Sequence, residues 1–250
     1  MAITFDRRRE AGDVLTPLDE KLLLLSKTDI DRVEVLSFTD ELRCMTAREF
    51  MQQVLKERFG VKILMIGYDN RFGHNREEGF DDYVRYGQEL GIEVRQLRAE
   101  GAISSSLIRQ LIAEGNISKA NELLGHPYAL LGRVEHGEHI GTQMGFPTAN
   151  IVADDQRQLI PVSGAYAVKV SIGDDTTWKA GMMNIGTRPT FDGNHQTLEV
   201  NIFDFDEDLY GKALCVEFVS RLREERRFDS MEALREQLEK DEIQAKKELL

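Results

Sequence analysis

Several features that would assign this chain to a protein class at once are scarce or missing. Its 250 residues include two cysteines, five prolines and one tryptophan. Cys44 and Cys215 lie too far apart for a C-x-x-C motif and are too few for a disulfide framework. No run of about 18 apolar residues occurs, and the opening MAITFD has no export-signal pattern. We therefore expect a cytoplasmic protein with reduced thiols and no membrane partner.

Basic residues are also fewer than acidic ones. Lys and Arg number 32 against 44 for Asp and Glu, a formal net charge of -12. This charge repels phosphodiester backbones, and the RRR at 7–9 is too short to override it, so we expect no nucleic-acid partner. Common catalytic signatures are absent, since there is no G-K-[ST], G-x-S-x-G, H-E-x-x-H or G-x-G-x-x-G.

The first half of the chain alternates short strand-like runs with helical patterns. The runs MAITF, DRVEVLSF, VKILMIG and IEVRQL predict strands, and VKILMIG is apolar enough to be buried on both faces. TAREFMQQVLKERFG predicts a helix that begins with a capping box of Thr46 and Glu49, and ISSSLIRQLIAEGN predicts another. This order predicts a parallel α/β domain, residues 1–125, with its ligands at the carboxyl ends of the strands.

In the second half the hydrophobic period changes to two. GAYAVKVSIG, TTWKAGMMNIG, QTLEVNIFDF and KALCVEFVSRL predict strands of an antiparallel sheet or small barrel, residues 126–250, after a boundary near Gly125. The last 23 residues predict a long helix packed on the barrel, capped by Asp229 or Ser230, with an apolar face of Met231, Leu234, Leu238 and Ile243.

The stretch GTQMGFPTANI has two interpretations. Gly141 and Gly145 allow a ligand to approach the backbone, Pro147 stiffens the turn, and the Thr148 hydroxyl is a possible Mg²⁺ ligand near phosphate oxygens. The lysine of the common phosphate loop is missing, however, and Gly/Pro turns are frequent. Motif chemistry alone favours a structural turn and leaves a phosphate site open.

The strand TLEVNIF has a polar face. Leu198, Val200 and Ile202 share one side, which puts Glu199 and Asn201 together on the other. Such a face is most often solvated, but a carboxylate there could also act as a general base toward an alcohol.

Polar groups also follow the apolar strand VKILMIG and begin the second helix. Asp69, Asn70 and Arg71 lie where a parallel sheet binds its ligand, although a polar crossover loop has the same composition. SSSLIR combines hydroxyls at a helix start with Arg109, a possible anion site or an ordinary N-cap. FDFDEDLYG lacks the glycine and glutamate of a calcium loop, and HGEH lacks a third metal ligand.

Taken in order, GYDNRFG, ISSSLIR, ANELLGHPYALLGRVEHGEHIGTQMGFPTANI, GAYAV, NIGTRPTF, LEVNIFDFDEDLYG and LREERRFDS resemble the bacterial bifunctional riboflavin kinase/FAD synthetase family. The resemblance covers nearly the whole chain. It implies a C-terminal kinase that transfers the γ-phosphoryl group of ATP to riboflavin, with Mg²⁺ and with riboflavin and ATP as small-molecule partners. The oligomeric state is not indicated.

The resemblance also implies roles for individual residues of the kinase half. Glu199 is expected to be the catalytic base, and Thr148 and Asn150 the ligands of Mg²⁺ and ATP. The glycines expected along the ATP loop are Gly132, Gly137, Gly141 and Gly145. The residues expected around the flavin are Asn184, Gly186, Arg223, Glu225 and Phe228.

The first half resembles the adenylyltransferase that converts FMN to FAD, a partial Rossmann-like domain. The residues expected to contact nucleotide or flavin there are Gly67, Asp69, Arg71, Phe72, Ser104, Ser105 and Arg109. The family's first βα unit, with its F-D-G-x-H-x-G-H motif, has no counterpart in this sequence, and a sheet without that central strand should expose apolar faces. We expect a riboflavin kinase without FAD synthesis; a fully bifunctional enzyme and a non-catalytic flavin- or nucleotide-binding module are the alternatives.

Overall fold

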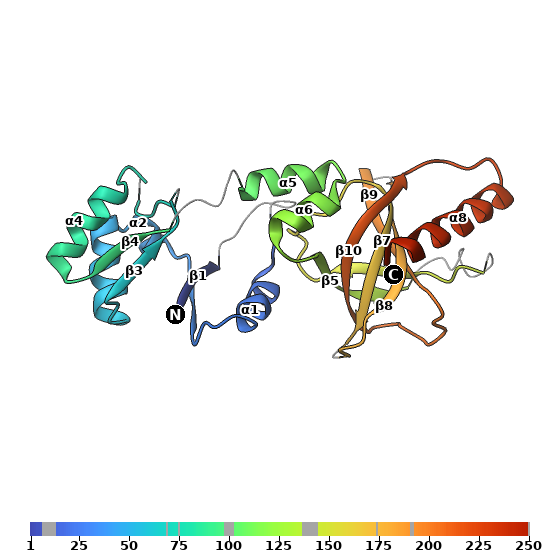
Figure 1. The fold of residues 1–250 in the computed structure, drawn as a ribbon. Helices are drawn as coiled ribbons and strands as arrows, with labels where there is room; N and C mark the ends of the chain where they lie inside the picture. The colour runs from blue at the N-terminus through green and yellow to red at the C-terminus, as the bar shows by residue number, and fades with distance from the viewer. Residues whose placement is uncertain are drawn as a thin grey trace. The chain divides into compact units, whose positions relative to one another are not determined.

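The computed structural model describes residues 1–6, 14–68, 70–74, 76–97, 103–136, 145–173, 175–190 and 193–249, except for the side chains of 188–190 and 193–195. They form two compact units (Figure 1). The first comprises Met1–Arg8 and Leu24–Ile103, and the second comprises Arg9–Leu23 and Ser104–Leu250. Within these ranges no helix combines the length and apolar character that crossing a bilayer requires. The first unit is α/β and the second is a barrel, so the predicted fold class is confirmed.

All four predicted strands of the first unit are present. β1 (Ala2–Asp6) pairs in parallel with β2 (Val33–Ser37), and β3 (Ile63–Ile66) pairs in parallel with β4 (Glu93–Gln96). The two pairs are separate two-stranded sheets, with no ladder between them among the described residues.

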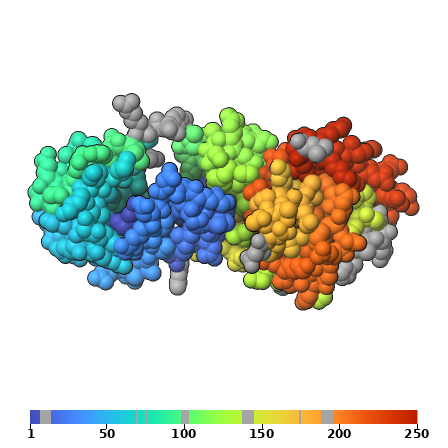
Figure 2. All heavy atoms as spheres, turned by 60° about the horizontal axis from the view of Figure 1, so that its bottom comes forward, coloured from blue at the N-terminus to red at the C-terminus, as the bar shows by residue number. Residues whose placement is uncertain are grey.

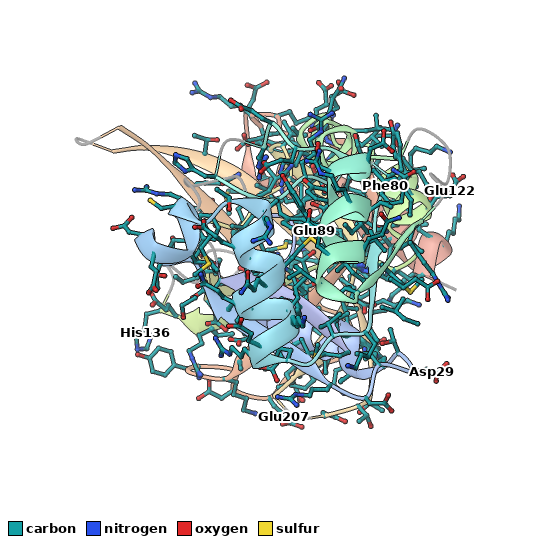
Figure 3. All side chains as sticks on the ribbon, turned by 90° about the vertical axis from the view of Figure 1, so that its left-hand side faces the viewer. Asp29, Phe80, Glu89, Glu122, His136 and Glu207 are labelled. Carbon is teal, nitrogen blue, oxygen red and sulfur yellow. The ribbon has the colours of Figure 1, made fainter. Side chains whose placement is uncertain are left out.

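Helices of the first unit follow local sequence signals. Its elements are α2 (Asp40–Cys44), α3 (Ala47–Glu49), which continues into η1 (Phe50–Arg58) with π-type hydrogen bonds, and α4 (Phe80–Leu90). The predicted capping box is confirmed, because Thr46 Oγ1 accepts from the Glu49 amide at 3.2 Å and Glu49 Oε2 accepts from the Thr46 amide at 2.8 Å. Glu89, labelled on α4 in Figure 3, pairs with Arg48 Nε at 3.1 Å, which links α3 and α4.

The prediction that VKILMIG is buried on both faces is wrong. Ile63 is 46% exposed and Met65 is 59% exposed, whereas Ile66 is buried. β3 pairs only with β4 within the described residues, so its other edge carries no strand. This exposure agrees with the expectation that a sheet without its central strand leaves apolar faces uncovered.

The second unit is built on a closed antiparallel barrel. Its strands are β5 (Tyr128–Glu135), β6 (Ala149–Ala153), β7 (Gly164–Ile172), β8 (Lys179–Thr190), β9 (Gly193–Ile202) and β10 (Ala213–Glu224), in the order β10-β5-β6-β9-β8-β7. The sequence did not predict β5 and β6, because Gly132 interrupts the alternation of β5 and β6 has only five residues. β6 begins within GTQMGFPTANI, which is therefore part loop and part barrel strand.

Two short helices precede the barrel and belong to its unit. α5 (Ser105–Ala113) and α6 (Ile117–Leu124) contribute Ile108, Ile112 and Ile117 to the barrel's hydrophobic core. Asn121 of α6 donates to the Phe218 carbonyl and accepts from the Tyr128 amide, both at 2.8 Å. The second compact unit therefore includes α5 and α6 as well as the chain after Gly125.

α8 (Met231–Leu249) lies against the outside of the barrel, on β7, β8 and β10 (Figures 1 and 2). Ser230 caps it, since its Oγ accepts from the Ala233 amide at 3.1 Å. The face turned to the barrel carries Leu234, Leu238, Asp241 and Ala245. Met231 is 47% exposed and Ile243 is 58% exposed, so the prediction that these two residues belong to the face packed on the barrel is wrong. A second core forms here between α8 and the outer barrel wall.

A buried carboxyl group, that of Glu20, should make the stability of the second unit depend on pH. Glu20 lies in α1 (Leu18–Ser26) and is 6% exposed, and its Oε2 has no hydrogen-bond partner among the described residues. Burial, followed by repulsion from Glu217, raises the pKa of Glu20 to about 7. The folded chain binds this proton more tightly than the unfolded chain, so the free energy of unfolding falls as the pH rises from about 4.5 through about 7.

We expect Glu20→Gln to remove this pH dependence. The variant should be more stable than the wild type by about 3 kcal/mol at pH 8 and close to it at pH 4.5. Urea unfolding followed by fluorescence of the single tryptophan, Trp178, measures the difference. Glu122→Gln, at an exposed position of α6, is the control. Parallel pH profiles for Glu20→Gln and the wild type would contradict the expectation.

Candidate functional site

Three residues predicted for the kinase site form one row across neighbouring strands. Asn150 of β6 lies opposite Glu199 of β9, and Glu199 lies opposite Asn184 of β8. Opposed residues on adjacent strands point to the same face. Leu198 and Val200, on either side of Glu199, belong to the barrel core, so the row faces outward. The register therefore brings together three polar groups from separate stretches of sequence.

The row continues around the barrel to a fourth and a fifth strand. Asn184 lies opposite Ala165 of β7, and Ala165 lies opposite Arg223 of β10. The small Ala165 side chain leaves space between the amide and the guanidinium. Arg223, predicted from the resemblance alone, is thus in register with Glu199.

A cavity of about 270 Å³ lies over this row, beside α8, and is called the α8 cavity below. Its walls combine apolar side chains with the polar Thr148, Asn184, Glu199 and Asn201 and with charged groups from the end of β10, the segment after it and α8. They are formed by Phe146, Thr148, Ala165, Met182, Met183, Asn184, Glu199, Asn201, Arg223, Glu225, Arg226, Phe228, Leu234, Leu238 and Asp241. An apolar slot with a few polar groups at one side suits a flat aromatic ligand that carries a polar chain.

A second cavity, of about 420 Å³, is called the Tyr210 cavity below. Its residues come from β5, β6, β9 and the acidic turn after β9: Val134, Glu135, His136, Pro147, Thr148, Ala149, Asn150, Val200, Ile202, Phe205, Asp206, Glu207, Asp208, Leu209 and Tyr210. The rings of His136 and Tyr210 stack at 3.8 Å; Figure 3 labels His136 and Glu207. Thr148 lines both cavities, so its side chain marks the place where two ligands could meet.

Asn201 fixes the segment that carries Thr148. Its Nδ2 donates to the Pro147 carbonyl at 2.7 Å, and it is only 6% exposed. Phe146 is buried in the core under α8, which anchors the same segment from its other side. The polar face of β9 is therefore not simply solvated. Asn201 was not among the predicted site residues, although its alternation with Glu199 was a usable signal.

Gly186 lies within β8 beside the side chain of Glu225. A Cβ built on Gly186 would lie 3.1 Å from Glu225 Oε1 and 3.3 Å from Asn184 Nδ2. Glu225 Oε1 also accepts from the Thr187 amide at 3.1 Å. Gly186 thus lets the Glu225 carboxylate approach β8 beside Asn184.

The glycines predicted for the ATP loop lie in different environments. Gly145 has a φ of +84°, a left-handed conformation that favours glycine. Gly132 lies buried within β5, where a Cβ would come within 2.5 Å of the Val152 carbonyl oxygen, and close strand packing accounts for it. Gly137 and Gly141 lie outside the described residues.

The first unit contains a cavity of about 680 Å³ lined in part by β1 and β3. Arg71 and Phe72 line it, together with Asn70, His74, Arg43 and apolar residues of β1 and β3. Phe72 stacks on Tyr83 at 4.2 Å, and its amide donates to the Tyr83 hydroxyl at 3.0 Å, so this ring packs into the core of the unit. Gly67 follows β3, and Asp69 lies outside the described residues.

The other residues predicted for adenylyl transfer belong to the second unit. Ser104 caps α5, because its Oγ accepts from the Leu107 amide at 3.2 Å. Ser105 is the first residue of α5, and Arg109 lies further along the same helix. Neither compact unit contains all the residues predicted for nucleotide and flavin in that reaction.

Comparisons with known proteins match the two halves of the chain to different family models. The family model described as riboflavin kinase matches residues 124–249, and the one described as FAD synthetase matches residues 2–107. The bifunctional riboflavin kinase/FMN adenylyltransferase of Escherichia coli (strain K12) is 41% identical over 236 residues, which cover 93% of this chain and 74% of that protein. The protein of the same name from Bacillus subtilis (strain 168) is 31% identical, covering 96% and 76%. A crystal structure titled as a macrolide-efflux protein from Streptococcus pneumoniae shares the fold with a TM-score of 0.86 and 32% identity, covering 98% of this chain and 82% of that one.

Proposed function

Because this chain belongs to the bifunctional riboflavin kinase/FMN adenylyltransferase family, we propose that its second unit transfers the γ-phosphoryl group of ATP to the 5′-hydroxyl of riboflavin. The observation that carries the proposal is the position of Glu199. It lines the α8 cavity in one row with Asn150 and Asn184, and Thr148 joins that cavity to the Tyr210 cavity. Flavin occupies the α8 cavity and ATP the Tyr210 cavity.

In the proposed reaction Glu199 orients the riboflavin hydroxyl and accepts its proton. The hydroxyl oxygen then bonds to the γ-phosphorus while the bond from that phosphorus to the bridging oxygen breaks, which gives FMN and ADP. Asn184 and Asn201 supply amide groups beside Glu199 that can hold the ribityl chain. The apolar walls exclude water from the acceptor side, which limits hydrolysis of ATP.

The residues at the junction of the cavities suit Mg²⁺. The Thr148 hydroxyl and the Asn150 amide oxygen are hard oxygen ligands, and magnesium bound with ATP obtains its other ligands from phosphates and water. Within the described residues no group of three or more His, Cys, Asp or Glu could hold a metal ion. The ion would neutralise charge on the transferred phosphoryl group. Acidic side chains in the Tyr210 cavity, among them Glu135, Asp206 and Glu207, make such a cation necessary for a triphosphate.

For the first unit we propose an FAD synthetase fold without adenylyl transfer in this chain of 250 residues. One feature supports this: among the described residues, β1 with β2 and β3 with β4 form separate two-stranded sheets. The family-model match over residues 2–107 favours the alternative, in which FMN is converted further to FAD.

One assay separates these functions. Riboflavin, ATP and Mg²⁺ should give FMN and ADP in equal amounts, and chelation of the metal should stop the reaction. FMN supplied with ATP and Mg²⁺ should give neither FAD nor pyrophosphate. Chromatography that resolves the three flavins measures both. Formation of FAD would show a bifunctional enzyme, and flavin binding without ADP formation would show a non-catalytic module.

A further inference from the structure

The helix that covers the α8 cavity contains a buried carboxylate. Asp241 is 2% exposed, although it lies on α8 among charged residues. Arg223 Nε donates to its two oxygens at 3.1 and 2.9 Å, and Arg223 Nη2 donates at 2.9 Å. Gln237 Nε2 adds a bond at 2.6 Å. Burying both charges carries a large desolvation cost, which this bidentate geometry offsets.

The hydrogen bonds of Arg223 all go to neighbouring protein groups. Besides Asp241, its guanidinium donates through Nη1 to the Glu224 carbonyl at 3.0 Å. Its Cζ lies 5.6 Å from the centroid of the Phe228 ring. Arg223 thus contacts Phe228 through the guanidinium group while Asp241 holds its edge.

A second cation contacts the same ring and is held by the same helix. Arg226 Cζ lies 4.7 Å from the Phe228 centroid, and Arg226 Nη2 donates to Gln237 Oε1. Gln237 is also the residue that donates to Asp241. Both guanidinium groups beside Phe228 are therefore tied, directly or through one amide, to the Asp241 carboxylate.

Phe228 is part of the α8 cavity wall, together with Leu234 and Leu238. It lies just beyond β10, where no strand ladder fixes its position. Its ring is instead held by the two cations. We propose that Asp241 is a positioning residue, which acts through Arg223, and through Gln237 and Arg226, to hold the Phe228 ring as a stacking wall for the flavin. This inference rests on the proposed placement of flavin in the α8 cavity.

The position of Asp241 in the sequence supports the role. It lies three residues after Leu238 and four before Ala245, on the stripe of α8 that faces the barrel. An apolar residue at this place would pack against the outer barrel wall without the cost of burying charge. The proposed role gives a reason for a carboxylate at this position, because Asp241 orients the Arg223 guanidinium.

The test compares Asp241→Asn with Glu239→Gln, which removes an exposed carboxylate paired with Arg235 on the same helix. We expect Asp241→Asn to raise both the Kd for riboflavin, from quenching of flavin fluorescence, and the KM for riboflavin by about 10-fold or more. The KM for MgATP should stay within about twofold, because no residue of this network lines the Tyr210 cavity. Glu239→Gln should leave both unchanged.

A double variant separates positioning from stability. Arg223→Met with Asp241→Leu replaces the buried pair by apolar side chains of similar size, which should restore the thermal midpoint lost in Asp241→Asn. Riboflavin affinity should stay low, because the ring has lost its guanidinium support. Recovery of riboflavin affinity in the double variant, or an equal rise of both KM values in Asp241→Asn, would overturn the proposal.

The binding measurement distinguishes this inference from the proposed function. If the wild type binds riboflavin in a manner that depends on Asp241 but makes no FMN, the kinase proposal fails and the positioning role stands. If it makes FMN and Asp241→Asn binds riboflavin normally, the positioning role fails alone.

Discussion

Glu199→Gln is expected to lower kcat for FMN formation by about 10²–10⁴-fold. The amide has nearly the shape of the carboxylate and still accepts a hydrogen bond, but it does not take the proton of the riboflavin hydroxyl. Riboflavin and MgATP should bind with near wild-type affinity, because the walls of both cavities are otherwise unchanged. Single-turnover FMN formation, measured beside riboflavin binding, separates the two effects.

Two further variants make this result interpretable. Glu122→Gln removes a carboxylate from the surface of α6, in the same compact unit, and should leave kcat unchanged. Glu199→Asp keeps the base but draws it back from the cavity, so it should retain more activity than Glu199→Gln. Wild-type kcat in Glu199→Gln would rule out Glu199 as the base, even if flavin binding persists.

Thr148→Ala should reduce kcat/KM for MgATP by about 10- to 100-fold, since a hydrogen bond or ligand bond to a charged group contributes about 1.5–3 kcal/mol. The effect should fall mainly on the nucleotide, because Thr148 connects the two cavities and belongs to the segment fixed by Asn201. Initial rates over a matrix of ATP and Mg²⁺ concentrations measure it.

Thr148→Ser is the matched control, because it keeps the hydroxyl and removes only a methyl group. It should remain within about threefold of the wild type. If Thr148→Ala leaves both the affinity for ATP and its dependence on Mg²⁺ unchanged, GTQMGFPTANI is a structural turn and not a phosphate site.

Features governed by neighbours along the chain could be predicted from the sequence. The capping box of Thr46 and Glu49, the cap at Ser230 and the parallel pairing in the first unit are all observed. Each depends on residues a few positions apart or on the short-range periodicity of apolar side chains. The resemblance to the family, carried by motifs such as GFPTAN and NIGTRPT, likewise needed only the linear order of residues.

Errors arose where a residue's environment depends on distant partners. β3 was expected to be buried because it is apolar, but half of its side chains are exposed where no strand covers its other edge among the described residues. On α8, hydrophobicity selected Met231 and Ile243 for the buried face, whereas packing on β7, β8 and β10 buries Asp241 and Ala245 instead. An apolar side chain favours burial, but whether it is buried depends on which elements pack against it.

The sequence by itself determined the two-part fold class, the local helix starts and the family to which the chain is similar. Tertiary structure decided the geometry of the candidate site. Strand register aligned Asn150, Glu199 and Asn184, and packing of α8 buried Asp241 against Arg223. The physical reason is that pairing register and helix packing are set by contacts between segments far apart in the chain, and a linear pattern of residue types does not contain the distances between them.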